Sequence, residues 1–205
     1  VAVSQVRDEV GRMLEMVSKN IDDAFGLLIS YDDKRRQKIA EREEYIDYLN
    51  KGISEYIVSL MSSEKSMSDS IQINGYYVII SNLERIGDHA INLAGYADDI
   101  KKWDQKFSDN VLEELEEMKQ QCLTALANVK DVTPENVDSV LSSAVIMEQK
   151  NDDMRDKYFK KQLQRLKKGK CKPQSGIVFS EVLTDFERMG DHTLNIAQQY
   201  KEMAQ

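Results

Sequence analysis

The stretch that decides the fold is Ser-Asn-Leu-Glu-Arg-Ile-Gly-Asp-His-Ala-Ile-Asn-Leu-Ala-Gly-Tyr, residues 81–96. It recurs as Thr-Asp-Phe-Glu-Arg-Met-Gly-Asp-His-Thr-Leu-Asn-Ile-Ala-Gln-Gln at residues 184–199, 103 residues further along a chain of 205. Glu, Arg, Gly, Asp, His, Asn and Ala are identical in the two copies, and most apolar positions match in kind. Both histidines of the chain occupy the same place in this motif. A repeat at half the chain length indicates an internal duplication.

Each copy of the motif reads as a helix with two faces. The apolar face has three- and four-residue spacing and consists, in the first copy, of Leu83, Ile86, Ala90 and Leu93. The acidic face has four-residue spacing, with Glu84, Asp88 and Asn92 in the first copy and Glu187, Asp191 and Asn195 in the second. Gly87 and Gly190 each cost about 1 kcal/mol relative to alanine inside a helix. They therefore indicate close approach of a neighbouring helix or of a ligand.

The rest of the first half also favours long helices. Only two prolines occur in the chain, and good helix formers dominate its composition. Apolar residues follow helical spacing in Val1–Ser30, in 34–61 and in a third segment that ends near Trp103. The breaks between them are Tyr31-Asp32-Asp33, with an aspartate as helix cap, and a turn at Ser62–Ser66.

The second half repeats this order. Ser108 is a good cap for a fourth helix, and Thr133-Pro134 is a good start for a fifth. Gly169 and Pro173 should end the fifth helix, and a sixth should run from about Gly176 to the end of the chain. We therefore predict an all-α fold of two tandem, duplicated three-helix bundles, spanning residues 1–104 and 105–205.

Charge and cysteine content narrow the functional classes. The net charge is −8, and an acidic protein repels nucleic acid and anionic lipid, so we expect no nucleic acid partner and no direct lipid binding. Cys122 and Cys171 are read as reduced thiols of a cytosolic protein. No apolar run is long enough to cross a membrane, and no secretory signal is visible. The chain begins with Val1 rather than Met, which is compatible with a domain excised from a longer protein.

The preceding helix of each half offers further acids at four-residue spacing. These are Glu43 and Asp47 in the first half and Glu148 and Asp152 in the second. If each helix is an antiparallel neighbour of the motif helix, four carboxylates can face each other in each half. Such oxygen ligands suit Mg²⁺, Mn²⁺, Ca²⁺ or iron, in a site of one or several ions.

These acids can also be ordinary surface charge with no ligand. Acid pairs at this spacing are usually a solvated helix face, and for the second-helix pairs alone that reading is the more common one. The repeated motif differs, because duplication of a fold alone has no need to keep polar positions. His89 and His192 lie away from the acidic face, so we expect them, with Asn92 and Asn195, to support the ligands from behind. We expect Arg85 and Arg188 to pair with carboxylates.

With these motifs the sequence resembles the PhoU family, whose members are duplicated three-helix bundles. The family's E(D)xxxD motif matches Glu84–Asp88 and Glu187–Asp191, with looser matches at Glu43–Asp47 and Glu148–Asp152. The sequence around the motif, with the stretch 164–169, is most similar to the cytosolic PhoU-like domain of bacterial Na⁺/phosphate cotransporter-like proteins.

The resemblance implies multinuclear metal clusters, often of iron, with Mn, Mg, Ca or Zn as alternatives, and no organic cofactor. It implies a regulatory role in phosphate transport and homeostasis, at the cytosolic face of the inner membrane. The expected partner is the membrane domain or subunit of a phosphate transporter, and a homodimer is left open. The alternative is a free-standing regulator of a phosphate ABC transporter and its signalling kinase.

Two further readings compete with this one. A carboxylate-bridged metal enzyme in a helix bundle usually needs Glu-x-x-His pairs that point into the core, whereas this motif has Glu-x-x-x-Asp-His, so we predict no enzyme. A metal-free helical scaffold is the other reading. One departure from the family pattern also matters: Asn151 and Arg155 take the places of Glu43 and Asp47 when Met154 is aligned with Ile46. The second cluster is therefore expected to use a shifted acid pair or to be incomplete.

Overall fold

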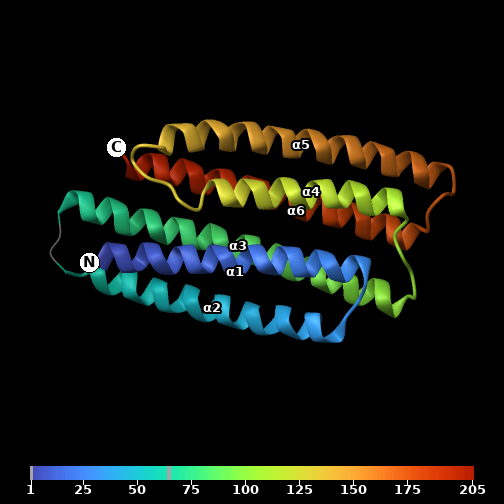
Figure 1. Cartoon of the computed structure of the whole chain (residues 1–205), viewed down its shortest axis with the longest axis horizontal. Helices are drawn as coiled ribbons and strands as arrows, with labels where there is room; N and C mark the ends of the chain where they lie inside the picture. Colours follow the sequence, from blue (N-terminus) through green and yellow to red (C-terminus); the bar gives the residue numbers. More distant parts are fainter. Residues whose placement is uncertain (1, 64–65) are drawn as a thin grey trace.

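The computed structural model describes residues 2–63 and 66–205, which form six α-helices and no strand. The helices are α1 (Ala2–Ile29), α2 (Asp33–Met61), α3 (Met67–Lys102), α4 (Asp109–Asn128), α5 (Val137–Lys167) and α6 (Pro173–Met203). Figure 1 shows them side by side along the long axis of the molecule, with both chain termini at one end. The predicted all-α fold of two three-helix bundles is confirmed.

Three helices begin at side-chain caps that the sequence supplies. The carboxylate of Asp32 accepts hydrogen bonds from the backbone N–H groups of Lys34 and Arg35, so it caps α2 as predicted. Ser108 caps α4, also as predicted, and Ser66, the last residue of the predicted turn, caps α3. Part of the predicted turn at Ser62–Ser66, namely residues 64 and 65, and the predicted helix start at Val1 lie outside the described residues.

The starts of the last two helices differ from the prediction. Helix α5 begins at Val137, because Thr133 and Asn136 exchange side-chain-to-backbone hydrogen bonds in both directions and close a turn before the helix starts. Gly169, with a φ of +66°, ends α5 as predicted. Pro173 lies in the first turn of α6, where its missing N–H costs nothing, so α6 starts three residues before Gly176.

The core combines the inner faces of both halves. Helix α1 packs against α2, α3 and α4, and α6 packs against α3, α4 and α5. The stripe predicted on α3 is fully buried at Leu83, Ile86, Ala90 and Leu93. The rings of Phe25 and Phe186, whose centroids are 6.5 Å apart, join the two halves. Burial of these apolar side chains, at about 25 cal/mol per Å², is the main force that holds the bundle together.

Helices α2 and α5 lie on the outside of the molecule. Each packs only within its own half in the part of the chain that the structure describes, α2 against α1 and α3 and α5 against α4 and α6. The seam between α2 and α3, and the matching seam between α5 and α6, therefore face outward and carry the predicted acids. None of the described helices combines the length and the hydropathy that a membrane span requires.

Candidate metal centre

The first acidic cluster lies on the seam between α2 and α3. Glu43 and Asp47 come from α2, Glu84 and Asp88 come from α3, and the four carboxylates are close enough for Asp47, Asp88 and Glu84 to act on the charge of Glu43. Asn50 adds a hydrogen bond, with its Nδ2 donating to Glu84 Oε2 at 3.0 Å. The structure thus brings together all four acids that the sequence predicts for this half.

Glu43 is the innermost acid of this cluster. Burial, together with the charges of Asp47, Asp88 and Glu84, raises its pKa from 4.5 to about 8. Its Oε2 atom is buried and has no hydrogen-bond partner among the described residues. Burial and the neighbouring charges of Asp88 and Asp47 also raise the pKa of Glu84. A bound cation would compensate for both the buried oxygen and the repulsion, so the residues present fit a metal ion.

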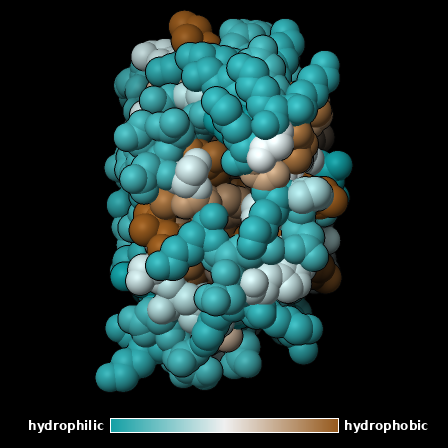
Figure 2. Space-filling model, turned by 90° about the vertical axis from the view of Figure 1, so that its right-hand side faces the viewer, coloured by the Kyte–Doolittle hydropathy of each residue, from teal (hydrophilic) through white to brown (hydrophobic). Residues whose placement is uncertain are grey.

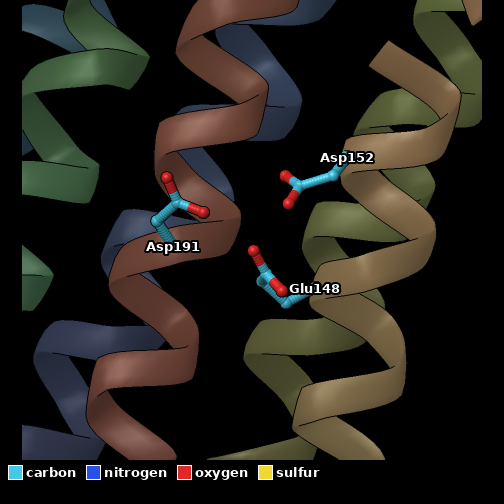
Figure 3. A group of neighbouring side chains, drawn as sticks. All are labelled: Glu148, Asp152 and Asp191. Atoms are coloured by element: carbon cyan, nitrogen blue, oxygen red, sulfur yellow. The ribbon is translucent and has the colours of Figure 1, made fainter. Parts of the chain in front are cut away.

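The second cluster lies on the seam between α5 and α6. Figure 3 shows the carboxylates of Glu148 and Asp152 on α5 pointing toward Asp191 on α6. One carboxylate oxygen from each lies within 4.8 Å of the others. A hydrogen bond with Asp152, followed by burial and the charge of Asp191, raises the pKa of Glu148 to about 7. The three oxygens are close enough to share one cation.

Glu187, the fourth acid predicted for this cluster, faces the guanidinium group of Arg155. Arg155 Nε lies 3.6 Å from Glu187 Oε2, and the guanidinium also lies 4.9 Å from the Phe159 ring centroid. Burial raises the pKa of Glu187, and the positive charge of Arg155 opposes that shift. The side chain of Arg155 thus forms with Glu187 an ion pair that has no counterpart at Glu84 among the described residues of the first half, where the more distant charge of Arg85 opposes the rise in pKa.

The motif glycines show how the two halves correspond. A Cβ atom added at Gly87 would lie 3.6 Å from Glu43 Oε2, whereas one added at Gly190 would meet the side chain of Asn151. Asn151 thus takes the place of Glu43, and Arg155, four residues later, takes the place of Asp47. The α5 acids that approach Asp191 are instead Glu148 and Asp152, three residues earlier on the helix, in line with the shifted acid pair expected from the alignment of Met154 with Ile46. Asn151 is held there by a hydrogen bond from its Nδ2 to the carbonyl of Phe186.

The motif histidines make their hydrogen bonds between the halves and not to the acidic clusters. His89 Nδ1 lies 2.7 Å from Asp185 Oδ1, and Asp185 also accepts hydrogen bonds from Asn92 Nδ2 and the hydroxyl of Tyr96. In the mirrored arrangement, His192 Nδ1 lies 3.2 Å from Asn82 Oδ1, to which Asn195 Nδ2 also donates a hydrogen bond. The two imidazole rings stack with centroids 5.7 Å apart.

This polar centre changes the roles expected for several motif residues. Burial, with the positive charges around it, lowers the pKa of His192 to about 4, so its imidazole is neutral at pH 7. Asp185 and Asn82 were not predicted, although both stand at the same place in the two copies of the motif. Arg85 and Arg188 are exposed and form no close ion pair with the described acids, but the charge of Arg85 acts on Glu84 and that of Arg188 acts on Asp191. Their pairing with carboxylates stays a prediction.

Comparison with known proteins finds similar proteins over nearly the whole chain and a family match in each half. Residues 10–97 and 115–200 match the family described as the PhoU domain. The "Phosphate-specific transport system accessory protein PhoU homolog 1" of Thermotoga maritima is 27% identical over 95% of this chain and 83% of its own length. The "Phosphate-specific transport system accessory protein PhoU homolog" of Clostridium acetobutylicum is 25% identical over 96% of this chain and 89% of its own length.

Solved structures share the fold. The crystal structure of PhoU from Pseudomonas aeruginosa superposes with a TM-score of 0.82 at 22% identity, over 98% of this chain and 96% of that one. The phosphate transport system regulatory protein PhoU from Streptococcus pneumoniae gives a TM-score of 0.83 at 18% identity, over 98% and 94% of the two chains. With two matched segments, one in each half, this chain belongs to the PhoU domain family.

Proposed function

We propose that this protein is a regulatory accessory protein of a phosphate transport system and that it binds metal ions through its two acidic seams. Its family supports the first part, because relatives that match nearly the whole chain are described as accessory proteins of phosphate-specific transport. This chain also spans 83% and 89% of those two relatives. We therefore favour the accessory protein over the cytosolic domain of a cotransporter, with a transporter subunit as its partner.

A single observation carries the metal part of the proposal, the buried and unpartnered Oε2 of Glu43 among three further carboxylates. Glu43, Asp47, Glu84 and Asp88 would hold the ion of the first half, and Glu148, Asp152 and Asp191 that of the second. An all-oxygen set suits a hard cation, with iron, manganese, magnesium or calcium ahead of zinc. The ion would supply positive charge that fastens α2 to α3 and α5 to α6.

A regulatory role is favoured over catalysis by where the acids lie. Asp47, Asp88 and Asp191 are exposed on the outer seams, whereas a helix-bundle metal enzyme carries its ligands in the bundle core. Metal bound on an outer seam changes the charge and rigidity of a surface that a partner protein can contact. This is the kind of change that a regulator needs.

The transport part is tested in a bacterium that lacks its own PhoU protein. Uptake of radiolabelled phosphate is measured during growth in phosphate-rich medium, with and without expression of this chain. We expect expression of this chain to lower phosphate uptake in phosphate-rich medium. Unchanged uptake, with the protein present at normal levels, would contradict the regulatory role.

Metal binding is tested by elemental analysis of the purified protein. The test variant is Glu84→Gln/Asp88→Asn/Glu187→Gln/Asp191→Asn. Its matched control removes the same charge at four exposed acids away from the seams, namely Asp8, Glu113, Asp131 and Glu135. We expect the control to keep the metal content of the parent and the test variant to lose most of it. Equal metal content in all three proteins would refute the proposal.

A further inference from the structure

The charge of this protein is unevenly distributed along its long axis. The α1–α2, α3–α4 and α5–α6 connections all lie at the right-hand end of Figure 1, opposite the chain termini. We call this surface the connection end and define it as residues 25–37, 98–113 and 163–177. It contains eleven basic and seven acidic residues, a net charge of +4 in a chain whose total is −8. The rest of the molecule therefore carries −12.

The basic charge of the connection end is concentrated around the α5–α6 connection. Five basic residues and no acid occur between Arg165 and Lys172. Arg165 is bound to Glu114, whereas the four lysines of this stretch are exposed and form no ion pair with the described acids. These are Lys167, Lys168, Lys170 and Lys172.

The α3–α4 connection adds to the same surface. Gln105 Nε2 donates a hydrogen bond to Gln174 Oε1 at 2.8 Å, which joins the two connections. Lys106, Lys170 and Lys172 line a shared recess of about 450 Å³ between them, together with Arg165 and a single acid, Asp104. Lys102 is exposed beside it. The lysines thus form one basic surface and not two separate ones.

Large apolar side chains are exposed at this same end. Ile177 is 62% exposed, Ile29 is 53% exposed and Trp103 is 37% exposed. Figure 2, which looks onto this end, shows a hydrophilic rim around a hollowed centre where apolar residues gather. Lysines combined with exposed isoleucine and tryptophan are typical of proteins that rest on the headgroup region of a bilayer.

We propose that the connection end docks on the surface of an anionic lipid bilayer. The acidic average charge led us to expect no lipid contact, but the seven acids of this end leave it a net charge of +4, and the acids of the two seams lie too far away to cancel that charge. Along α3, Glu84 lies about 27 Å from Lys102 at 1.5 Å per residue. That is about three Debye lengths at physiological ionic strength, so the lysines face the membrane almost unopposed by the clusters.

This docking goes beyond the proposed regulation and does not depend on metal. End-on docking would leave the outer seams, which run parallel to the long axis, free beside the membrane. A regulator held in this way can reach a membrane transporter without a specific protein contact as its first step.

The test uses the full chain with vesicles of phosphatidylcholine alone or mixed equally with phosphatidylglycerol. Trp103 is the only tryptophan, so its fluorescence reports on the docking surface directly. We expect binding and a blue shift with the anionic vesicles, neither with the neutral ones, and release in 0.5 M NaCl. Each lysine near an anionic surface strengthens binding roughly fivefold, so Lys168→Gln/Lys170→Gln/Lys172→Gln should weaken it roughly 100-fold.

The matched control is Lys19→Gln/Lys51→Gln/Lys150→Gln, which removes the same charge at three exposed positions away from the connection end. It should bind anionic vesicles within about threefold of the parent, since distant charges are screened. Circular dichroism confirms that both variants are folded. The proposal is overturned if anionic vesicles do not bind the parent, if neutral vesicles bind it equally well, or if the two triple variants lose binding to the same extent.

Discussion

Replacement of Glu43 by glutamine should stabilise the metal-free protein at alkaline pH. The raised pKa means that the folded, metal-free chain holds a proton on Glu43 more tightly than the unfolded chain does. The stabilising contribution of that proton is fully present below pH 4.5 and is lost as the pH rises through about 8. Glutamine is a neutral side chain of the same shape, so the variant does not suffer this loss.

The magnitude follows from the shift in the pKa of Glu43. One pKa unit corresponds to about 1.4 kcal/mol, so the rise from 4.5 to about 8 sets an upper limit of about 5 kcal/mol on the effect. Glu43 is only half-buried, and solvent screens part of its interaction with the other carboxylates. We therefore expect the variant to gain about 1–3 kcal/mol in free energy of unfolding at pH 9 and almost nothing at pH 4.5.

The assay is urea unfolding at pH 4.5 and pH 9 in the presence of a chelator, followed by the helical signal in circular dichroism. Glu44→Gln is the matched control, because Glu44 is the next residue on α2 but is exposed. A lower stability of Glu43→Gln at pH 9, or an equal gain at both pH values, would contradict the raised pKa of Glu43. With metal present the sign should reverse, because binding displaces the proton of Glu43 and the glutamine variant has lost a ligand.

The remaining predictions concern the second half and the interface. Asn151→Glu with Arg155→Asp should rebuild the first cluster in the second half and add about one bound metal ion per chain; unchanged metal content by elemental analysis would count against the role assigned to Arg155. Gly190→Ala should lower the free energy of unfolding by about 1–3 kcal/mol, because its methyl group would displace the hydrogen-bonded side chain of Asn151. Gly87→Ala should be neutral or stabilising by up to about 1 kcal/mol, since ordinary contacts surround that site; similar melting temperatures for the two alanine variants would refute the comparison. Asp185→Ala should cost about 3–5 kcal/mol in urea unfolding, because three donors would lose their buried acceptor, and a loss below about 1 kcal/mol would show that the polar centre contributes little.

The fold could be predicted because its signals are local. Apolar spacing along α3, the caps at Asp32 and Ser108 and the repeat of the motif each depend on residues within a few turns of one another. The start of α5 was missed for a related reason. Thr133 and Pro134 are good first-turn residues, but the hydrogen bonds between Thr133 and Asn136 form a separate turn that the pattern of residue types does not distinguish from a cap.

The site was predicted less completely because its geometry depends on how helices pack. The four acids predicted for the first half, from the repeated motif and from four-residue spacing on the preceding helix, lie close together on one seam. In the second half the same spacing pointed to Glu187 with the others, but the alignment of α5 against α6 places Arg155 beside it. The contact of His89 with Asp185 could not be predicted from the sequence, because it depends on how one half packs against the other.

The crossed contacts of the two motif histidines also bear on dividing the protein into fragments. Asp185 is an acid, whereas its counterpart Asn82 is an amide, so the halves are no longer interchangeable. Two copies of the first half would face His89 with Asn82, and two copies of the second would face each histidine with a buried acid. Fragments 1–104 and 105–205 should therefore reassemble with each other in preference to themselves. The interface between the halves has two different faces, so the fragments suit a split reporter that reconstitutes only as a heterodimer.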